Sequence, residues 1–456
     1  MAENHNTLTR RAFLAAATTS ATLTVAGCRT NTARVSPGKR SPNELVNCAG
    51  IGVGGKGFSD IMNCRKENVV ALCDVDARQA EEAWYNLPDA KRYKDYRKML
   101  EEMGGQIDAV TISTPDHMHA PAAYMAMEMG IHVYVQKPLT HTVAEARLLA
   151  ETARKNGVVS QMGNQGHSGN GVRRMCEMVW DGAIGEVREA HVWTDRPGGR
   201  WPQGVGEPLP KEPVPGKLDW NLWLGAAPVR EFNNGYVPHK WRGWWDFGCG
   251  ALGDMACHIM DPAFWALRLG EAGTFSCEIV KMEDWNTQTP PARSVIKYRF
   301  PARAGMPPVD VYWYNDGLLP PRPEGVPEEE KLGDGKNGSY FVGSEGVATT
   351  GEYGGNSRLL PEARMAGYTR PEPTIERVSG QNHYRDWLDA IKGEKAAACS
   401  DFRYAGPFTE MVLVGALALK SGEKVEYDVA KGQIMNNPKA DAMITKEYRN
   451  GFELPC

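Results

Sequence analysis

One glycine-rich stretch, residues 45–57, constrains the fold of this chain more than any other. An apolar run, Leu45–Ile51, breaks into glycines and is followed by a helical pattern that begins at Phe58. A strand, a tight turn and a helix in this order, with the spacing G-x-G-x-x-G, are typical of the first unit of a parallel sheet that binds a dinucleotide. The phosphates would lie at the free N–H groups of the helix start. The candidate binding residues are Gly52, Val53, Gly54, Lys56 and Gly57.

The next apolar run, Val69–Cys73, ends in an acid at the position where such folds bind the nucleotide ribose. Asp74 lies seventeen residues beyond Gly57, and its carboxylate would accept hydrogen bonds from the adenosine ribose. The same charge would repel a 2′-phosphate, which favours NAD over NADP, although Arg78 one helical turn later would weaken that repulsion. A sheet turn that binds no nucleotide is the alternative interpretation.

Residues 1–28 have the pattern of an export signal. Arg10 and Arg11 precede an uncharged run, rich in Ala and Thr, that ends at Gly27, as in twin-arginine signals. The run is too short and too weakly apolar for a membrane span. Cys28 fits the acylated residue of a lipoprotein, with plain cleavage as the alternative, and residues 29–42 would be a linker. We therefore expect a protein exported in folded form to the periplasm or to an outer membrane surface.

Composition excludes several other classes of function. The chain has 52 basic and 56 acidic residues and a net charge of -4, so it lacks the basic footprint of a nucleic-acid binder. Its cysteines form no C-x-x-C pair or His/Cys cluster, and we therefore predict no metal site and few or no disulfides. Cys48 and Cys73 fall inside apolar strand patterns and are predicted to be small core residues.

From residue 43 to residue 165, strand and helix patterns alternate as in a parallel sheet. Further strands are expected at 108–113, 131–135 and 158–162. Ligands bind beyond the carboxyl ends of such strands. The polar residues at those ends are Thr114, Pro115 and His119, then Gln136 and Lys137, and finally Asn164.

The length of the chain predicts two domains or one large one, and the remaining chain, 166–456, carries further strand and helix patterns. Strand patterns occur at 187–193, 274–280, 294–300, 309–314 and 339–342. A helical pattern at 252–269 places Asp254, His258 and Asp261 on one face, because residues four and seven apart share a helix face.

These motifs together resemble the superfamily of glucose-fructose oxidoreductase, inositol dehydrogenase and the rhizopine-catabolism proteins (Gfo/Idh/MocA). The resemblance rests on the glycine loop, Asp74, Thr114-Pro115 with His119, Lys137-Pro138, and Trp241-Arg242 followed by Asp254 and His258. It implies a Rossmann domain followed by an α/β domain with an open, mostly antiparallel sheet. That sheet often bears an oligomer interface in the family, so we expect a homo-oligomer, either a dimer or a tetramer.

The resemblance also implies roles for individual residues. Lys137 and His258 would move protons during oxidation of a hydroxyl, and Asp254 would orient the substrate or the imidazole. A lysine at the sheet edge suits this task because burial and a nearby nicotinamide lower its pKa. The family usually has Glu before this lysine, so Gln136 removes a carboxylate that would stabilise the ammonium form. Residues beside the cofactor would include Thr114, Pro115, His119, Gln136, Asn164, Trp241 and Arg242.

The stretch from Trp193 to His239 combines aromatic rings with hydrogen-bond donors. Such surfaces suit sugar rings, whose C–H faces pack on indole while Arg and His bind hydroxyls. Arg196, Tyr236 and His239 are the candidate substrate contacts. The alternative interpretation is that the aromatic rings wedge long loops onto the domain.

These patterns lead to one main functional hypothesis and two alternatives. The main hypothesis is an NAD-dependent oxidoreductase acting on a secondary hydroxyl of a sugar or glycoside, with tightly bound NAD recycled in place because no free pool is expected outside the cytoplasm. The first alternative is an NAD-dependent glycosidase that oxidises C3 transiently. The Gly-Gly-His-Gly-Gly loop associated with such enzymes is absent from the sequence. The second alternative is a non-catalytic sugar-binding protein with structural NAD.

Overall fold

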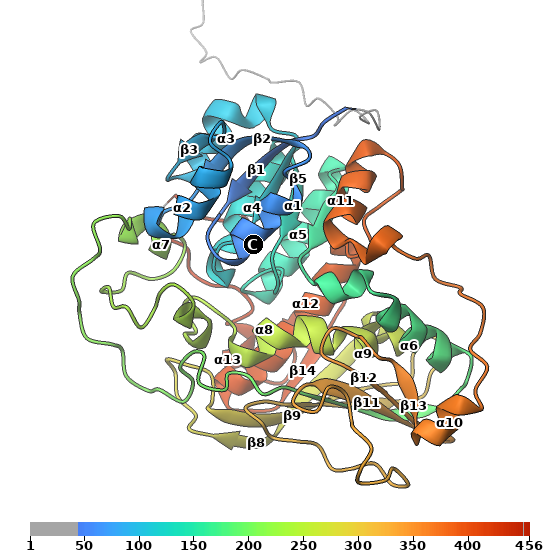
Figure 1. Ribbon diagram of the computed structural model, residues 1–456. Coiled ribbons are helices and arrows are strands. Elements are labelled where there is room, and N and C mark those ends of the chain that lie inside the picture. Colours follow the sequence, from blue (N-terminus) through green and yellow to red (C-terminus); the bar gives the residue numbers. More distant parts are fainter. Residues whose placement is uncertain (1–43, 450) are drawn as a thin grey trace, which may run out of the picture. The chain divides into compact units, whose positions relative to one another are not determined.

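The computed structural model describes residues 44–449 and 451–456, and the predicted signal and linker lie outside the described residues. The first part of this chain forms a six-stranded parallel sheet (Figure 1) with the order β3-β2-β1-β4-β5-β6. Its strands are β1 Asn47–Ile51, β2 Asn68–Cys73, β3 Lys91–Tyr93, β4 Ala109–Ile112, β5 His132–Val135 and β6 Ser160–Met162. The predicted Rossmann topology is therefore confirmed. Strand β3 was missed because its three residues, Lys91, Arg92 and Tyr93, carry no apolar run.

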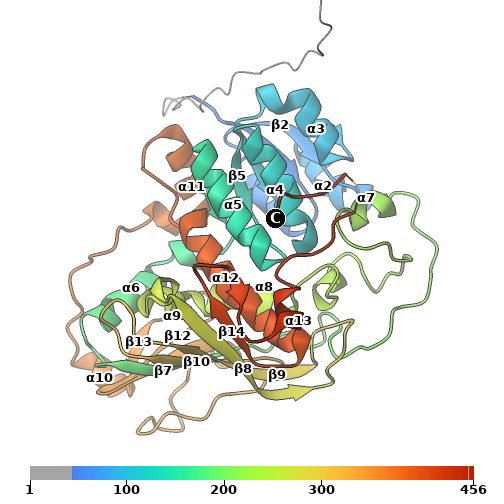
Figure 2. The same ribbon diagram turned by 180° about the vertical axis from the view of Figure 1, so that it is seen from behind.

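Helices cover both faces of this sheet. One face packs against α1 Lys56–Asn63, α2 Ala77–Asn86 and α11 His383–Lys392, and the other packs against α3 Tyr96–Met103, α4 His119–Glu128 and α5 Val143–Asn156. The views in Figures 1 and 2 show the two faces in turn. Burial on both faces explains why strands β1, β4 and β5 are almost continuously apolar.

The second part is built on a nine-stranded sheet of order β13-β12-β11-β7-β10-β9-β8-β14-β15. The pairing of β7 with β10 is parallel and the other pairings are antiparallel, which confirms the predicted mostly antiparallel sheet. Its strands are β7 Val187–Trp193, β8 Thr274–Glu283, β9 Arg293–Phe300, β10 Val309–Tyr314, β11 Gly338–Gly343, β12 Gly346–Thr350, β13 Arg358–Leu360, β14 Val425–Asp428 and β15 Gln433–Ile434.

Helices α8 and α12 pack between the two sheets and contribute to one continuous core (Figure 1). The helices of this part are α6 Asn170–Trp180, α7 Trp220–Leu224, α8 Gly250–Ile259, α9 Asp261–Ala266, α10 Glu362–Ala366, α12 Phe402–Ser421 and α13 Pro438–Asp441. None of the helices within the described residues is both long and apolar enough to cross a membrane. The nine cysteines of these residues are all unpaired, and Cys48 and Cys73 are buried in strands as predicted.

The predicted helix at 252–269 is wrong in one respect, because two helices occupy it. Helix α8 ends at Ile259 and α9 begins at Asp261. Pro262 lies in the first turn of α9, where its missing N–H costs nothing but where it cannot continue a preceding helix. Asp261 therefore leaves the face that carries Asp254 and His258. Its carboxylate accepts hydrogen bonds from His167, at 2.9 Å, and from Tyr404.

Candidate active site

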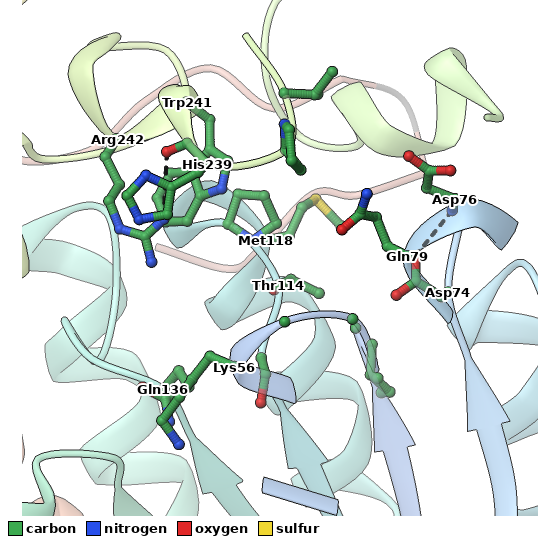
Figure 3. A pocket seen from close by; sticks show the side chains of 18 of the residues that line it. Lys56, Asp74, Asp76, Gln79, Thr114, Met118, Gln136, His239, Trp241 and Arg242 are labelled. Carbon is green, nitrogen blue, oxygen red and sulfur yellow. Dashed lines mark hydrogen bonds between the residues drawn. The ribbon is translucent and has the colours of Figure 1, made fainter. Parts of the chain in front are cut away.

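A cavity of about 600 Å³ lies where the carboxyl ends of the parallel strands face α8 and the segment 237–242. Most of the predicted site residues line it: Gly52, Gly54, Lys56, Asp74, Thr114, Pro115, Gln136, Lys137, Arg196, His239, Trp241, Arg242, Asp254 and His258. In Figure 3, Asp74, Asp76 and Gln79 lie on one side of the pocket, and His239 and Arg242 lie on the other. The cavity is thus long enough to have two chemically different ends.

The glycines shape the first end. Gly52 has φ +73° and a Cβ there would lie 2.8 Å from the Ser113 carbonyl oxygen, so the turn admits only glycine. A Cβ on Gly57 would overlap the carbonyl oxygen of Gly52, which keeps α1 close to β1. A Cβ on Gly54 would lie 2.5 Å from Gln79 Cβ, whereas one on Gly55 would meet nothing within 4 Å. The open side of the loop is therefore at Gly55, beside the start of α1.

Asp74 is held by backbone amides at the tip of β2. Its Oδ2 accepts a hydrogen bond from Val53 N and its Oδ1 accepts one from Asp76 N, each at 2.9 Å. Burial raises the pKa of Asp74 to about 6, and these two amides act in the opposite direction. The amide of Val53 is thus used by Asp74, and the predicted contact of Val53 with the cofactor stays a prediction. Arg78 is also engaged, because its Nη2 lies 2.6 Å from Asp76 Oδ2.

A buried polar network supports the glycine loop from below. Asp60 is fully buried and accepts hydrogen bonds from Ser113 Oγ at 2.7 Å, from Gln136 Nε2 at 2.9 Å and from Lys56. Tyr384 on α11 donates to the same carboxylate at 2.6 Å. The sequence interpretation missed Asp60 and Tyr384. It also missed why Gln stands at 136, since a glutamate there would bring a second carboxylate against Asp60.

Lys137 lies at the other end and is paired with a carboxylate from the second domain. Its Nζ donates to Asp254 Oδ1 at 2.7 Å and to the Asp254 carbonyl oxygen at 2.9 Å. Arg242 Nε donates to the same Oδ1 at 2.9 Å. Burial opposes ionisation of Asp254, but the two cations outweigh it and hold the pKa of Asp254 well below its usual range. Lys137 therefore does not lack a carboxylate partner, and Asp254 orients Lys137 rather than the imidazole.

His258 faces the same end one helical turn from Asp254. It is 5% exposed, its Nδ1 has no hydrogen-bond partner within the described residues, and its ring meets the Tyr353 ring edge-on at 4.8 Å. Burial, with the charge of Lys137 second, lowers the pKa of His258 well below its usual value. The imidazole is therefore neutral, which is the form that can act as a base. Tyr353, from the turn before β13, was not predicted, because nothing in its local sequence marks it.

Five predicted residues do not line the cavity: Val53, Gly57, His119, Asn164 and Tyr236. The His119 ring bridges the carbonyl oxygens of Thr114 and Pro138, at 2.9 and 2.8 Å, and so fixes two loops that do line it. Asn164 is buried and accepts a hydrogen bond from Ser400 Oγ at 2.7 Å. These two residues position the site from outside the cavity.

Tyr236 is fully buried in an aromatic cluster with Trp220, Trp244 and Phe247, and its hydroxyl accepts from Leu209 N at 3.0 Å. Its predicted contact with substrate is therefore wrong in this arrangement. Most aromatic residues of the 193–239 stretch wedge loops onto the domain, as the alternative interpretation held. Trp201, Trp223 and His239 do line the cavity. No group of His, Cys, Asp and Glu suited to a metal ion occurs among the described residues.

The fold and this cavity define a two-domain protein whose first domain is built to bind a dinucleotide. Residues 46–164 match the family description "Oxidoreductase family, NAD-binding Rossmann fold", and residues 173–300 match "Oxidoreductase family, C-terminal alpha/beta domain". The chain therefore belongs to the Gfo/Idh/MocA oxidoreductase family.

Two relatives from Shewanella carry the names of glycoside-hydrolysing enzymes. "Glycosyl hydrolase family 109 protein 1" of Shewanella sp. (strain MR-4) is 34% identical over 156 residues, which cover 32% of this chain and 34% of that protein. "Alpha-N-acetylgalactosaminidase" of Shewanella oneidensis is 33% identical over the same length. The chain thus matches about a third of the length of these relatives.

Solved structures share the fold at lower identity. The WlbA dehydrogenase of Bordetella pertussis, in complex with NADH and UDP-GlcNAcA, is 14% identical, with a TM-score of 0.57 over 84% of this chain and 98% of that one. GenD2 from gentamicin A biosynthesis, in complex with NAD, is 19% identical, with a TM-score of 0.57 over 87% and 100% of the two chains.

Proposed function

We propose that this protein is an NAD-dependent oxidoreductase that acts on a secondary hydroxyl of a sugar or glycoside. One observation carries the proposal. Lys137 from the dinucleotide domain and Asp254 from the second domain are joined at 2.7 Å within a cavity that His258 also lines. A cation held by a carboxylate, beside a neutral imidazole, is suited to removing the proton of a hydroxyl during oxidation.

The residues at the first end fit a dinucleotide. The open side of Gly55, at the start of α1, leaves room for a pyrophosphate beside free amides. The carboxylate oxygens of Asp74 face the cavity and would accept the ribose hydroxyls, which favours NAD over NADP. Bound NAD supplies an acceptor for the hydride that leaves the carbon bearing the hydroxyl.

The chain's own residues then bind the reacting hydroxyl and remove its proton. The Lys137 ammonium donates a hydrogen bond to the reacting hydroxyl oxygen, while Asp254 and Arg242 keep it in place. The imidazole of His258, which lines the cavity, accepts the hydroxyl proton. Arg196 and His239 line the same cavity and bind other hydroxyls of the sugar.

We also propose where the protein is located. The twin-arginine pattern at Arg10 and Arg11 predicts export in folded form, with the protein soluble or lipidated at Cys28. Because no free NAD is expected there, the cofactor would stay bound and be regenerated in place. A homo-oligomer remains our expectation from the family.

An NAD-dependent glycosidase is the second candidate, and the relatives named glycosyl hydrolase family 109 favour it. A non-catalytic sugar-binding protein is disfavoured, because such a protein has no need for Lys137 to be held at 2.7 Å from Asp254.

The test is to incubate the purified protein, with NAD bound, with aryl glycosides and a keto-sugar acceptor. Matched oxidation of the sugar and reduction of the acceptor support the oxidoreductase. Release of the aglycone at constant bound NAD supports the glycosidase. If neither reaction occurs while sugars still bind, the enzymatic proposal is overturned.

A further inference from the structure

A second cavity of about 500 Å³ adjoins the first and is not used by the chemistry above. Its walls come mainly from the segment 197–205, together with Leu209, Gly235, Lys240, Trp244, Ala292 and Asp316. Arg200 and Trp201 line both cavities. The two spaces therefore meet at these two side chains.

The second cavity joins the first at its reactive end. The Trp201 ring lies 5.6 Å from the His239 ring, centroid to centroid. The His239 carbonyl oxygen accepts a hydrogen bond from Arg242, which in turn holds Asp254. Figure 3 shows His239 and Arg242 on the side of the pocket away from Asp74 and Asp76. A ligand group in the second cavity would therefore be attached to the sugar rather than to the nucleotide.

The segment that forms the second cavity is fixed against the helix that carries the reactive residues. Gln203 Oε1 accepts hydrogen bonds from Ala251 N in α8, at 2.8 Å, and from Trp201 Nε1, at 3.1 Å. Gln203 Nε2 donates to the Pro291 carbonyl oxygen at 2.8 Å. These hydrogen bonds thus fix the position of the second cavity relative to Asp254 and His258 on α8.

We propose that this second cavity binds a second sugar ring, so that the substrate is a disaccharide or a longer glycoside. The inference rests on the proposed sugar function. Pro197, Pro202 and Val205 offer apolar surface to the C–H faces of a ring, and the almost fully buried Trp201 lines the same cavity. Arg200 and Lys240 are exposed donors, and Asp316 is an acceptor. Apolar walls with a few polar groups suit a sugar better than an alkyl chain.

The volume of the first cavity also supports a separate position for a second sugar ring. Pockets for drug-sized ligands have volumes of roughly 300–1,000 Å³, and a dinucleotide is larger than such a ligand. A cavity of about 600 Å³ that holds a dinucleotide therefore has little room for more than one reacting ring. Any second ring has to pass Arg200 and Trp201.

The experiment compares hexoses with disaccharides of the same hexoses, namely cellobiose, maltose and lactose against glucose and galactose. Turnover by the NAD-loaded protein and calorimetric binding are both measured. We expect at least one disaccharide to have a kcat/KM about tenfold higher than its hexose. Val205→Trp fills the second cavity and should remove that advantage while turnover of the hexose stays the same. Lys240→Ala, at an exposed position that is safe for folding, should reduce the advantage about threefold.

Val229→Trp is the matched control, because Val229 is 80% exposed and lines neither cavity. Hexose turnover without any disaccharide advantage, or an advantage that survives both Val205→Trp and Lys240→Ala, overturns the subsite and leaves the proposed function intact. If no hexose and no disaccharide binds or reacts, the sugar function fails and the subsite fails with it.

Discussion

At the scale of single residues, Lys137 is defined by partners far away in the chain. The neighbouring Gln136 turns to Asp60, so the carboxylate beside the Lys137 ammonium is Asp254, which comes from the second domain. The lysine is correctly placed only when the two domains are packed together. This part of the site therefore needs both domains.

Lys137→Ala and His258→Ala should each slow oxidation of the substrate by about 10²- to 10⁴-fold, because each removes a group that handles the proton. NAD should remain bound in both variants, since neither side chain holds the glycine loop. Turnover and calorimetric titration with NAD together check this. Lys66→Ala, at an exposed position away from the cavity, is the control. Normal turnover in either variant would contradict the role given to that residue.

Asp74 should make NAD binding depend on pH. Its pKa is raised to about 6, so the carboxyl becomes neutral as the pH falls below 6 and then accepts ribose hydrogen bonds less well. The Kd for NAD should therefore rise between pH 7 and pH 5, and Asp74→Asn should bind weakly with little dependence on pH. Asp74→Ala should also relax the exclusion of NADP. Calorimetric measurement of the Kd for NAD at pH 7 and at pH 5 tests this. If the Kd of Asp74→Asn changes with pH as much as that of the unchanged protein, another group causes the dependence.

Single residues also show most clearly which parts of the site could not be predicted from the sequence. Glycine spacing and the acid after the second strand are local signals, so the sequence could single out Gly52, Gly54 and Asp74, which line one cavity. Their role in cofactor binding stays a prediction. Asp60, Tyr353 and Tyr384 were missed because they meet the site through contacts across many residues of chain. Tyr236 was misplaced because aromatic residues beside donors look alike in a sugar site and in a buried wedge.

At the scale of elements, α8 matters most, because it carries both Asp254 and His258. Its N-cap residue, Cys249, offers no side-chain cap. Asp116, from the end of β4, supplies one instead, since its Oδ2 accepts from Cys249 N at 3.1 Å. Burial raises the pKa of Asp116 to about 7, with Arg242 and Lys137 acting against it. The dinucleotide domain thus fixes the start of the helix that faces it.

Asp116→Ala should lower the free energy of unfolding by about 1–3 kcal/mol, because a buried amide loses its acceptor. It should also reduce kcat, since the start of α8 then loses its hydrogen bond to Asp116 of the dinucleotide domain and keeps the one to Gln203. Asn437→Ala is the matched control: Asn437 caps α13 by accepting from Ala440 N at 3.0 Å, and neither it nor its chain neighbours line the cavity. That variant should lose about 1 kcal/mol with unchanged kcat. Denaturant unfolding and steady-state kinetics measure both quantities, and equal kcat values in the two variants would contradict the role of Asp116.

Elements were also where the sequence predicted best. Long apolar runs and alternating patterns gave the parallel strands and most of the second sheet, because burial imposes those periods directly. The break at Pro262 was missed because the apolar residues of α8 and α9 continue one pattern across it. Strand β3 was missed because a short edge strand has little to bury.

At the scale of the whole described chain, the two domains share their cores. After the second sheet, α11 returns to the parallel sheet, where Trp387 is fully buried against it. Lys392 at the end of α11 pairs with Glu67 Oε1 at 2.7 Å, and both side chains are about 5% exposed or less. The predicted boundary at 165/166 therefore separates two parts of the sequence that pack against each other. The contact of α11 with the parallel sheet could not be predicted because the two lie more than 200 residues apart in the chain.

This arrangement predicts that the described domains unfold together. Lys392→Met keeps the apolar stem but leaves buried Glu67 with only Arg385, at 3.9 Å, as a cationic partner, which should cost about 3 kcal/mol. Adding Glu67→Gln should restore most of that loss, because the amide oxygen still accepts from Val46 N while no charge remains buried. Far-UV circular dichroism and tryptophan fluorescence should report one coincident transition in every variant, and NAD at 100 times its Kd should stabilise that transition by about 2.7 kcal/mol. Two separate transitions, of which NAD moves only one, would show instead that the dinucleotide domain is stable without α11.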